Sequence, residues 1–452
     1  MKKLILFFTA LCFTLCLIAQ DELTQSIDSY LSSIYPDNEP GAIVLVAKNG
    51  KPIYRKAFGL ANLELNAEMT PENVLELGSI TKQFTAVSIL MLEEQGKLNI
   101  EDEIIKYIPD YPTNDKKITI HHLLNHTSGI KSYTSMESFF SLARNDMSPT
   151  ELIDVFKNEP MDFDPGERFL YNNSGYVILG HIIEEVSGMT YEDFIEKNIF
   201  EKLGMHHSYY GKMKQIIPLR ASGYQTEGGT YSNAEYLSLT LPYAAGSLMS
   251  TVDDLLIWQN AINANKLIKR SSLEKAINGS TLNSGERITY GYGWGRSELK
   301  KSPIISHSGG IFGYTTNEIY FPHEDIYVVG LSNCNCKSIS QATTKIGAMA
   351  IGKPFPDIKN EIQLSEDQLR KWVSAYQFES VIRHITMMDG KLFSQREGST
   401  KLPIYAITEN HFIFEEGTTE YHFSEDESGK RIVTMNTAND TFEGVEIDKE
   451  AP

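Results

Sequence analysis

Strand-like segments lie at both ends of residues 41–332 and enclose a helical middle. Residues 41–62, GAIVLVAKNGKPIYRKAFGLAN, predict two strands joined by a tight turn at Asn49 and Gly50, a pair typical of β-hairpins. From about residue 118 to 264 apolar side chains recur at helical spacing, and from about 290 to 332 short strands return. This order predicts an α/β domain whose sheet is closed by the two ends of the domain.

A second domain follows a segment with two prolines and no periodic pattern, GKPFPDIKN. One short helix, SEDQLRKWVSAY, is expected next, and then short strands with turns at Asp389-Gly390 and Ser428-Gly429. A chain of this length is too long for one hydrophobic core. We therefore predict a signal peptide at 1–20, a first domain at 21–352, and a small antiparallel β-barrel or sandwich at 353–452.

The N-terminus indicates export. Lys2 and Lys3 precede an apolar run that ends near Ala19, which is typical of a secretory signal peptide and too short for a membrane anchor. Lipid attachment at Cys12 or Cys16 is disfavoured because a leucine precedes each cysteine. We expect a periplasmic or extracellular protein with no integral membrane span after cleavage.

Charge excludes some classes of partner. The chain has 59 acidic and 41 basic side chains and a formal net charge of -18. This balance disfavours nucleic acids and anionic membrane surfaces.

Cysteines and histidines give little sign of a metal site. Cys334 and Cys336 are so close in sequence that we expect no disulfide between them. On a helix, His122 and His126 would share a face, but no acidic third ligand is evident nearby. The sequence predicts neither a metal nor another cofactor.

The segment ELGSITKQFTA, residues 76–86, contains a candidate nucleophile. Ser79 and Lys82 are three residues apart, so on a helix the amine can reach the hydroxyl. Burial at a helix N-terminus would favour a neutral lysine, which can accept a proton. The same spacing recurs at Ser272 and Lys275, so the pattern alone leaves open that Ser79 is only the polar start of a helix.

Two further motifs supply candidate partners. Tyr171 and Asn173 precede an amphipathic helix, and we expect a nearby Lys82 charge to lower the pKa of Tyr171 and make it an acid/base group. Asn173 is suited to hydrogen-bond Lys82 and a substrate amide. The alternative is a core tyrosine beside a helix cap, and Tyr231 with Asn233 repeats the spacing in an expected loop.

The third motif is His307, Ser308, Gly309 and Gly310, at the end of an expected strand. Small residues there let a substrate lie along the strand edge and leave a backbone N–H for an oxyanion. The alternative is an ordinary tight turn.

Together and in this order, these three motifs resemble those of the serine β-lactamase and penicillin-binding-protein superfamily, in its class C-like branch. The resemblance covers about residues 25–350 and includes DPGERFLYNNSGYVILG and AAGSLMSTVDDLLIW. It implies an antiparallel sheet flanked by helices beside an all-helical subdomain, and the C-terminal part resembles a lipocalin-like barrel.

The resemblance also implies roles for the motif residues. Ser79 would be the acylated nucleophile, with Lys82 and Tyr171 sharing acid/base work and Asn173 orienting the substrate. The N–H groups of Ser79 and Gly310 would form the oxyanion hole.

One departure bears on the substrate. His307 stands where β-lactamases and transpeptidases usually have lysine, and an unperturbed histidine titrates near pH ~6.5. We therefore expect weak, pH-dependent capture of a substrate carboxylate, with a rate inflection at about pH 6 to 7. This favours an esterase or D-peptidase over an efficient β-lactamase.

The predicted activity is hydrolysis of D-amino-acid peptides, short esters or β-lactams through an acyl-enzyme. The alternative is a non-hydrolytic envelope protein that binds a peptidoglycan fragment or another small ligand in the same cleft. The sequence leaves the oligomeric state open.

Overall fold

A computed structural model describes residues 20–212, 214–415, 417–438 and 440–447. The chain forms two compact units: unit 1 spans Met1–Ser297 and Pro303–Thr343, and unit 2 spans Glu298–Ser302 and Thr344–Pro452. The predicted leader lies outside the described residues except for Gln20, and residues 20–34 are helical. The domain boundary between 352 and 353 stays a prediction.

Unit 1 is built on a six-stranded sheet with the order β12-β13-β14-β15-β1-β2. Its strands are β1 (Ala42–Lys48), β2 (Lys51–Phe58), β12 (Gly295–Leu299), β13 (Ser302–Ile311), β14 (Tyr314–Phe321) and β15 (Ile326–Ser332). Strand β1 pairs antiparallel with both β2 and β15. The two ends of the domain therefore close the sheet, and the hairpin at Asn49 and Gly50 is confirmed.

Helices fill the middle of unit 1, as predicted. They are α2 (Thr81–Glu94), α3 (Ile120–Leu124), α4 (Phe139–Leu142), α5 (Pro149–Phe156), α6 (Asn173–Ser187), α7 (Tyr191–Ile195), α8 (Glu201–Leu203), α9 (Tyr243–Gly246), α10 (Val252–Asn263) and α11 (Arg270–Ile277). Short 3-10 or π segments in this unit are η1 (Gly78–Ile80), η2 (Ile104–Lys106), η3 (Tyr133–Ser135) and η4 (Glu196–Phe200). Helix α12 (Ile339–Ala350) spans the division of the chain after Thr343, and η5 (Ile358–Asn360) belongs to unit 2.

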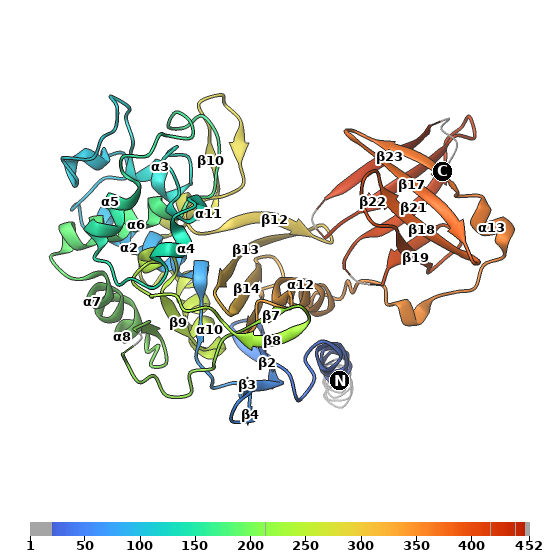
Figure 1. Cartoon of the computed structure of the whole chain (residues 1–452), viewed down its shortest axis with the longest axis horizontal. Helices are drawn as coiled ribbons and strands as arrows, with labels where there is room; N and C mark the ends of the chain where they lie inside the picture. The colour runs from blue at the N-terminus through green and yellow to red at the C-terminus, as the bar shows by residue number, and fades with distance from the viewer. Residues whose placement is uncertain (1–19, 213, 416, 439, 448–452) are drawn as a thin grey trace, which may run out of the picture. The chain divides into compact units, whose positions relative to one another are not determined.

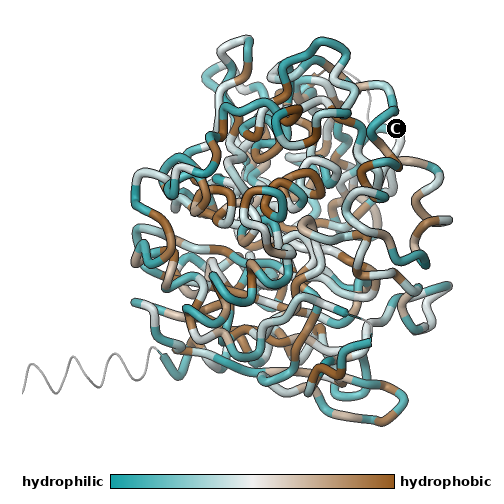
Figure 2. Tube along the Cα trace, turned by 90° about the vertical axis from the view of Figure 1, so that its left-hand side faces the viewer, coloured by the Kyte–Doolittle hydropathy of each residue, from teal (hydrophilic) through white to brown (hydrophobic). Residues whose placement is uncertain are grey.

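Helix α2 lies at the centre of this helical layer. It packs against α6 and α9, while α10 packs on strands β1 and β15 (Figure 1). Phe84 of α2 stacks on Trp258 of α10 with ring centroids 4.0 Å apart, which joins the helical layer to the helix on the sheet. Hydrophobic stretches concentrate inside these layers, and hydrophilic residues follow the outer loops (Figure 2).

Three two-stranded sheets and one three-stranded sheet of short strands complete the described part of unit 1. Their strands are β3 (Leu60–Asn62), β4 (Ala67–Glu68), β5 (Leu75–Glu76), β6 (Tyr209–Tyr210), β7 (Tyr224–Glu227), β8 (Thr230–Asn233), β9 (Leu248–Ser250), β10 (Ser280–Thr281) and β11 (Arg287–Ile288). Strand β5 pairs with β9, and η1 follows β5 directly. No helix in the described ranges is both long and apolar enough to cross a membrane.

Cys334 and Cys336 form a disulfide, so the expectation of two unpaired thiols was wrong. Their Cα atoms are 5.2 Å apart, inside the usual disulfide range. In an extended strand, residues two apart are separated by roughly 6.6 Å. The chain bends after β15, and this bend brings the two cysteines within bonding distance.

Unit 2 contains a closed antiparallel barrel in which eight strands follow one another in chain order. These are β16 (Ser374–Phe378), β17 (Val381–Met388), β18 (Lys391–Arg396), β19 (Leu402–Ala406), β20 (His411–Phe414), β21 (Glu420–Glu425), β22 (Arg431–Asn436) and β23 (Thr441–Ile447), preceded by α13 (Glu366–Arg370). This is an up-and-down barrel, the lipocalin type of architecture. The expected helix SEDQLRKWVSAY ends earlier than predicted, because Ser374 already begins a strand that pairs on both sides.

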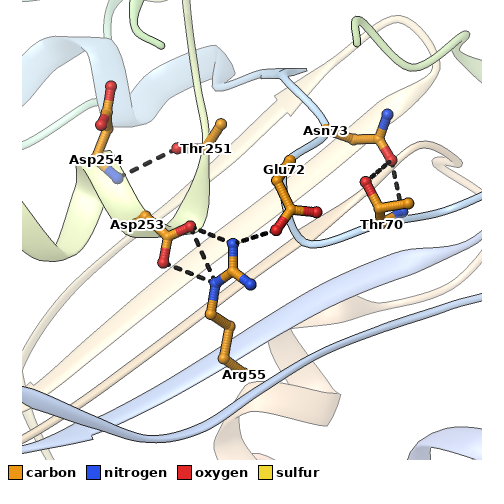
Figure 3. Close-up of polar contacts among 7 residues, drawn as sticks. All are labelled: Arg55, Thr70, Glu72, Asn73, Thr251, Asp253 and Asp254. Carbon is orange, nitrogen blue, oxygen red and sulfur yellow. Dashed lines mark hydrogen bonds and ion pairs between the residues drawn. The ribbon is translucent and has the colours of Figure 1, made fainter. Parts of the chain in front are cut away.

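Arg55 of β2 links the sheet edge to two other segments of unit 1 (Figure 3). Its guanidinium donates to both carboxylate oxygens of Asp253, which lies in the first turn of α10, and to Glu72 at 2.9 Å. A guanidinium that donates two hydrogen bonds to one carboxylate makes a stronger contact than a single lysine ion pair. All three side chains are partly exposed, which weakens these ion pairs.

We expect Arg55→Ala to lower the free energy of unfolding by roughly 1 kcal/mol, because both carboxylates lose their partner. Urea titration of the full chain measures it. The matched control is Arg270→Ala, which removes an exposed pair with Glu274 on one helix and should cost less than about 0.5 kcal/mol. Equal effects of the two substitutions would contradict the linking role of Arg55.

Candidate active site

Ser79 lies in the turn that connects strand β5 to helix α2. It is the middle residue of η1 and precedes α2 by two residues, so it stands just before the helix and not in its first turn. Gly78 adopts φ 55°, a left-handed conformation that suits glycine. The serine is half-buried while its neighbours Gly78 and Ile80 are buried, so its hydroxyl is presented from a rigid turn.

Lys82 makes three contacts with its amine. Nζ lies 3.0 Å from Ser79 Oγ, 2.8 Å from Asn173 Oδ1 and 2.9 Å from the carbonyl oxygen of Ala245. The Asn173 and Ala245 oxygens are pure acceptors, so each takes one N–H of the amine. A neutral amine has two N–H bonds and one lone pair, which then faces the Ser79 hydroxyl.

Burial favours that neutral form of Lys82. The side chain is fully buried, and desolvation holds the pKa of Lys82 well below its usual value of 10.5. This confirms the predicted direction of the shift. The Ser79–Lys82 contact is therefore suited to move a proton from the hydroxyl to the amine.

Tyr171 and Ser79 line the same hollow, and Lys82 Nζ lies 4.8 Å from the Tyr171 ring centroid. Desolvation raises the pKa of Tyr171, so the expected lowering was wrong. The physical reason is burial of the hydroxyl, which disfavours the charged phenolate more than the neighbouring groups stabilise it. Tyr171 is thus a protonated donor at neutral pH.

Asn173 begins helix α6, whose N-cap is Asn172. The Asn173 side chain is fixed at both ends, because Oδ1 accepts from Lys82 and Nδ2 donates to Thr134 Oγ1 at 3.0 Å. The first of the two contacts expected for Asn173, the one with Lys82, is present in the structure.

The end of β13 approaches the nucleophile turn closely. A Cβ placed on Gly309 would lie 2.0 Å from the carbonyl oxygen of Leu77 and 3.1 Å from Ser79 N, whereas one on Gly310 would meet nothing within 4 Å. Thr316 Oγ1 of strand β14 donates to the same Leu77 carbonyl at 2.8 Å and fixes its position. The motif is thus part of a strand, and the alternative of an isolated tight turn is excluded.

Both ring nitrogens of His307 form hydrogen bonds within the protein. Nδ1 lies 2.6 Å from the Ser308 carbonyl oxygen, which fixes it as the donor, and Nε2 lies 2.9 Å from the Tyr290 hydroxyl, from which it accepts. Desolvation lowers the pKa of His307 to about 3. The expectation that His307 titrates at pH 6 to 7 is therefore contradicted, because the ring is buried beside Lys82 and cannot gain charge there.

Two hollows meet at Ser79 and Gly310. The smaller is a cavity of about 120 Å³ lined by apolar side chains that include Phe139, Leu237 and Phe312. The larger has a volume of about 450 Å³, and its lining is Ser79, Tyr171, Tyr290, Gly295, Ser306, His307, Ser308 and Gly310. That lining contains no lysine or arginine. A ligand at Ser79 therefore meets an apolar pocket on one side and an uncharged polar surface on the other.

The repeated motifs lie elsewhere and have other partners. Ser272 Oγ donates to Glu94 at 2.6 Å, and Lys275 pairs with Glu93 at 3.0 Å. Tyr231 lies on strand β8, not in a loop, and donates to Glu39 at 2.6 Å. These residues hold surface elements together.

The paired histidines of residues 121–126 also have structural partners. His121 Nδ1 contacts the Tyr292 hydroxyl, and His122 caps α3 through Thr119. His126 follows the end of α3 and has φ 62°, so it does not share a helix face with His122.

Sequence reasoning missed two residues of the site. Ala245 contributes a backbone carbonyl, which no side-chain pattern reveals, although the segment AAGSL around it was noted. Tyr290 holds His307, and its only signal was its place among expected strand residues.

We expect Gly309→Ala to destabilise the site strongly, because its Cβ would collide with the Leu77 carbonyl. The loss should exceed about 2 kcal/mol in free energy of unfolding or show as lost reactivity of Ser79. Gly310→Ala is the matched control and should be well tolerated, since it keeps the N–H and meets open space. Equal tolerance of both would contradict the close approach of β13.

The sequence profile described as Beta-lactamase matches residues 34–343. Penicillin-binding protein 4* of Bacillus subtilis (strain 168) is 30% identical over 411 residues, which cover 84% of this chain and 89% of that protein. Protein flp of Staphylococcus aureus (strain MRSA252) is 26% identical over 76% of this chain and 70% of its own length.

Solved structures agree with these sequence matches. The octameric penicillin-binding protein homologue from Pyrococcus abyssi has a TM-score of 0.66 and 27% identity, covering 94% of this chain and 99% of that one. The fold is also similar to a D-stereospecific amidohydrolase from Streptomyces sp., with a TM-score of 0.64 and 24% identity over 73% of this chain and 99% of that one. The predicted family resemblance is confirmed: the chain belongs to the β-lactamase family of serine hydrolases.

Proposed function

We propose that this protein is an exported serine hydrolase that forms an acyl-enzyme at Ser79 and cleaves esters or amides with no carboxylate on the leaving group. The observation that carries the proposal is the buried Lys82 amine, whose two N–H bonds are taken by Asn173 and Ala245 and whose lone pair faces Ser79. A serine hydroxyl at such a base is equipped for attack on a carbonyl carbon.

The proposed reaction has two stages. Lys82 Nζ takes the Ser79 proton while Oγ bonds to the substrate carbonyl carbon, and the oxyanion lies between the N–H groups of Ser79 and Gly310. When the tetrahedral intermediate collapses, Tyr171 gives its proton to the leaving oxygen or nitrogen and is reprotonated from Lys82. Water then attacks the carbonyl carbon of the ester and loses a proton to Lys82. As the bond between this carbon and Ser79 Oγ breaks, Lys82 returns the proton to Oγ, which frees the acid and restores Ser79.

The leaving-group preference follows from the larger cavity. Its lining has no lysine or arginine, and His307 is neutral with both nitrogens engaged. A substrate carboxylate would lose its hydration there without meeting a cation, which is costly. The proposal therefore favours short esters, amides, and D-peptides whose leaving group has no free carboxylate. It disfavours β-lactams, whose carboxylate the missing lysine would bind.

The apolar cavity supports a matching acyl group. At about 120 Å³ and lined by Phe139, Leu237 and Phe312, it fits one hydrophobic side chain of the acyl part. We propose that the substrate contributes an aliphatic or aromatic group there.

We also propose that the protein acts in the periplasm or outside the cell. The support is the leader pattern at residues 1–20 and the likeness to a relative named for penicillin binding. A non-hydrolytic binding protein would not need a neutral amine beside the serine. The Ser79→Ala labelling experiment below distinguishes this alternative from the hydrolase.

Ser79→Ala should abolish labelling and hydrolysis while the protein stays folded, because the nucleophile is lost. The measurement is intact-mass spectrometry after incubation with a fluorophosphonate, a penicillin or a p-nitrophenyl ester. Ser272→Ala is the control with the repeated spacing and should react like wild type. No adduct on folded wild-type protein with any reagent would reject the hydrolase in favour of the binder.

Tyr171→Phe should lower kcat by roughly a hundredfold or more, the usual effect of losing a general acid. The loss should be larger for an amide than for a p-nitrophenyl ester, whose leaving group needs no proton. Tyr231→Phe is the control and should leave both rates near wild type, since Tyr231 contacts Glu39. Equal losses on the two substrates would contradict proton donation by Tyr171.

The kcat/KM profile should show no inflection from His307 between pH 6 and 7, because burial keeps the pKa of its ring at about 3. Adding a cation at this place, with His307→Lys, should shift preference toward peptides that end in a free carboxylate and away from their C-terminal amides. Both substrates are compared on variants whose folding is verified by circular dichroism. An unchanged preference would mean that this position does not face the leaving group.

A further inference from the structure

A cluster of two histidines and a glutamate lies on the outer face of the barrel. His411 of β20 and His422 of β21 are direct cross-strand partners, and Glu420 precedes His422 by two residues on the same strand. The alternating residues Phe412, Tyr421 and Phe423 belong to the barrel core. Because side chains alternate between the faces of a sheet, the cluster points away from that core.

The three side chains converge on one point. The two imidazole rings stack with centroids 4.0 Å apart. Nε2 of His411 lies 2.9 Å and Nε2 of His422 lies 3.8 Å from Glu420 Oε2, and one ligand atom from each residue lies within 4.8 Å of the others. Around a tetrahedral zinc ion with bonds of about 2.0–2.2 Å, ligand atoms are roughly 3.3–3.5 Å apart, so small side-chain adjustments suffice.

The surroundings leave the donor atoms facing one another. Glu420 is 6% exposed, and its other oxygen, Oε1, accepts from Lys300, which belongs to the same unit. His411 Nε2 is buried, and its contact with Glu420 does not satisfy hydrogen-bond geometry. A carboxylate held by an outer partner and an imidazole nitrogen without a hydrogen bond are the components of a metal site that lacks its ion.

We propose that His411, Glu420 and His422 bind a zinc ion, with water in the fourth position. The donor set is two imidazoles and one carboxylate, which suits zinc among the divalent metals. This revises the expectation of no metal, which considered only the histidines near residue 122. The proposal does not depend on the hydrolase activity, because none of its ligands lines the cavities at Ser79.

Such an ion would join strands β20 and β21 at the point where β20 begins. It would stabilise the folded barrel in proportion to zinc concentration, since a ligand that binds only the native state adds to its stability. Lys300 would act as the outer partner that fixes the Glu420 carboxylate.

The test is isothermal titration of the full chain with zinc chloride after treatment with EDTA and dialysis, together with the visible absorption of the cobalt-loaded protein. We expect one zinc per chain and a cobalt spectrum of four-coordinate type. His422→Ala should weaken zinc binding at least about tenfold, because even outer partners of metal ligands contribute that much. His422 is partly exposed, so this variant should fold.

His323→Ala, which removes an exposed histidine from unit 1, is the control and should bind zinc like wild type. Thermal unfolding should show a zinc-dependent rise for wild type and His323→Ala and a smaller rise for His422→Ala. No zinc uptake by folded wild-type protein, or equal affinity in wild type and His422→Ala, would overturn the proposal and leave the cluster an ion-pair network around Glu420.

Discussion

The burial of one lysine amine is the constraint on which the active site depends. Lys82 has no contact with water, and its polar contacts are Ser79, Asn173 and the Ala245 carbonyl. A charged ammonium in that place would lose its hydration for contacts that only partly replace it. The neutral form is therefore favoured, and a neutral amine beside a hydroxyl can accept the proton of that hydroxyl.

Burial sets the states of the neighbouring groups in the same way. It disfavours the phenolate of Tyr171 and the charged ring of His307, so Tyr171 keeps its proton and His307 stays neutral. The backbone adds the other half of the site, since β13 approaches the nucleophile turn as closely as Gly309 allows. Side chains from the helical layer and backbone from the sheet therefore meet at Ser79.

Much of this arrangement follows from local sequence. The spacing of Ser79 and Lys82, the hairpin at residues 49–50 and the returning strands near residue 300 are short-range patterns, and the structure has each of them. The lowered pKa of Lys82 was predicted, but the pKa shifts of Tyr171 and His307 were not, because their burial is produced by segments far apart in the chain. The Cys334–Cys336 disulfide depends on the shape of one bend, which composition does not reveal.

The register between neighbouring strands could not be predicted from the sequence either. No sequence motif singled out His411 or His422, and only the pairing of β20 with β21 brings them together with Glu420. Likewise, the role of Tyr290 depends on its contact with His307, which lies 17 residues further along the chain. Sequence patterns therefore located the elements and the nucleophile, while the charge states and second contacts required the three-dimensional structure.

The most direct test of the account is the pH dependence of Ser79 acylation by an uncharged fluorophosphonate, followed by intact mass. Because desolvation holds the pKa of Lys82 well below its usual value of 10.5, the rate should rise from acid pH and become level well below pH 10.5. A rate that keeps rising about tenfold per pH unit toward the ordinary lysine pKa of ~10.4 would contradict the account, since Lys82 would then be protonated in the resting protein.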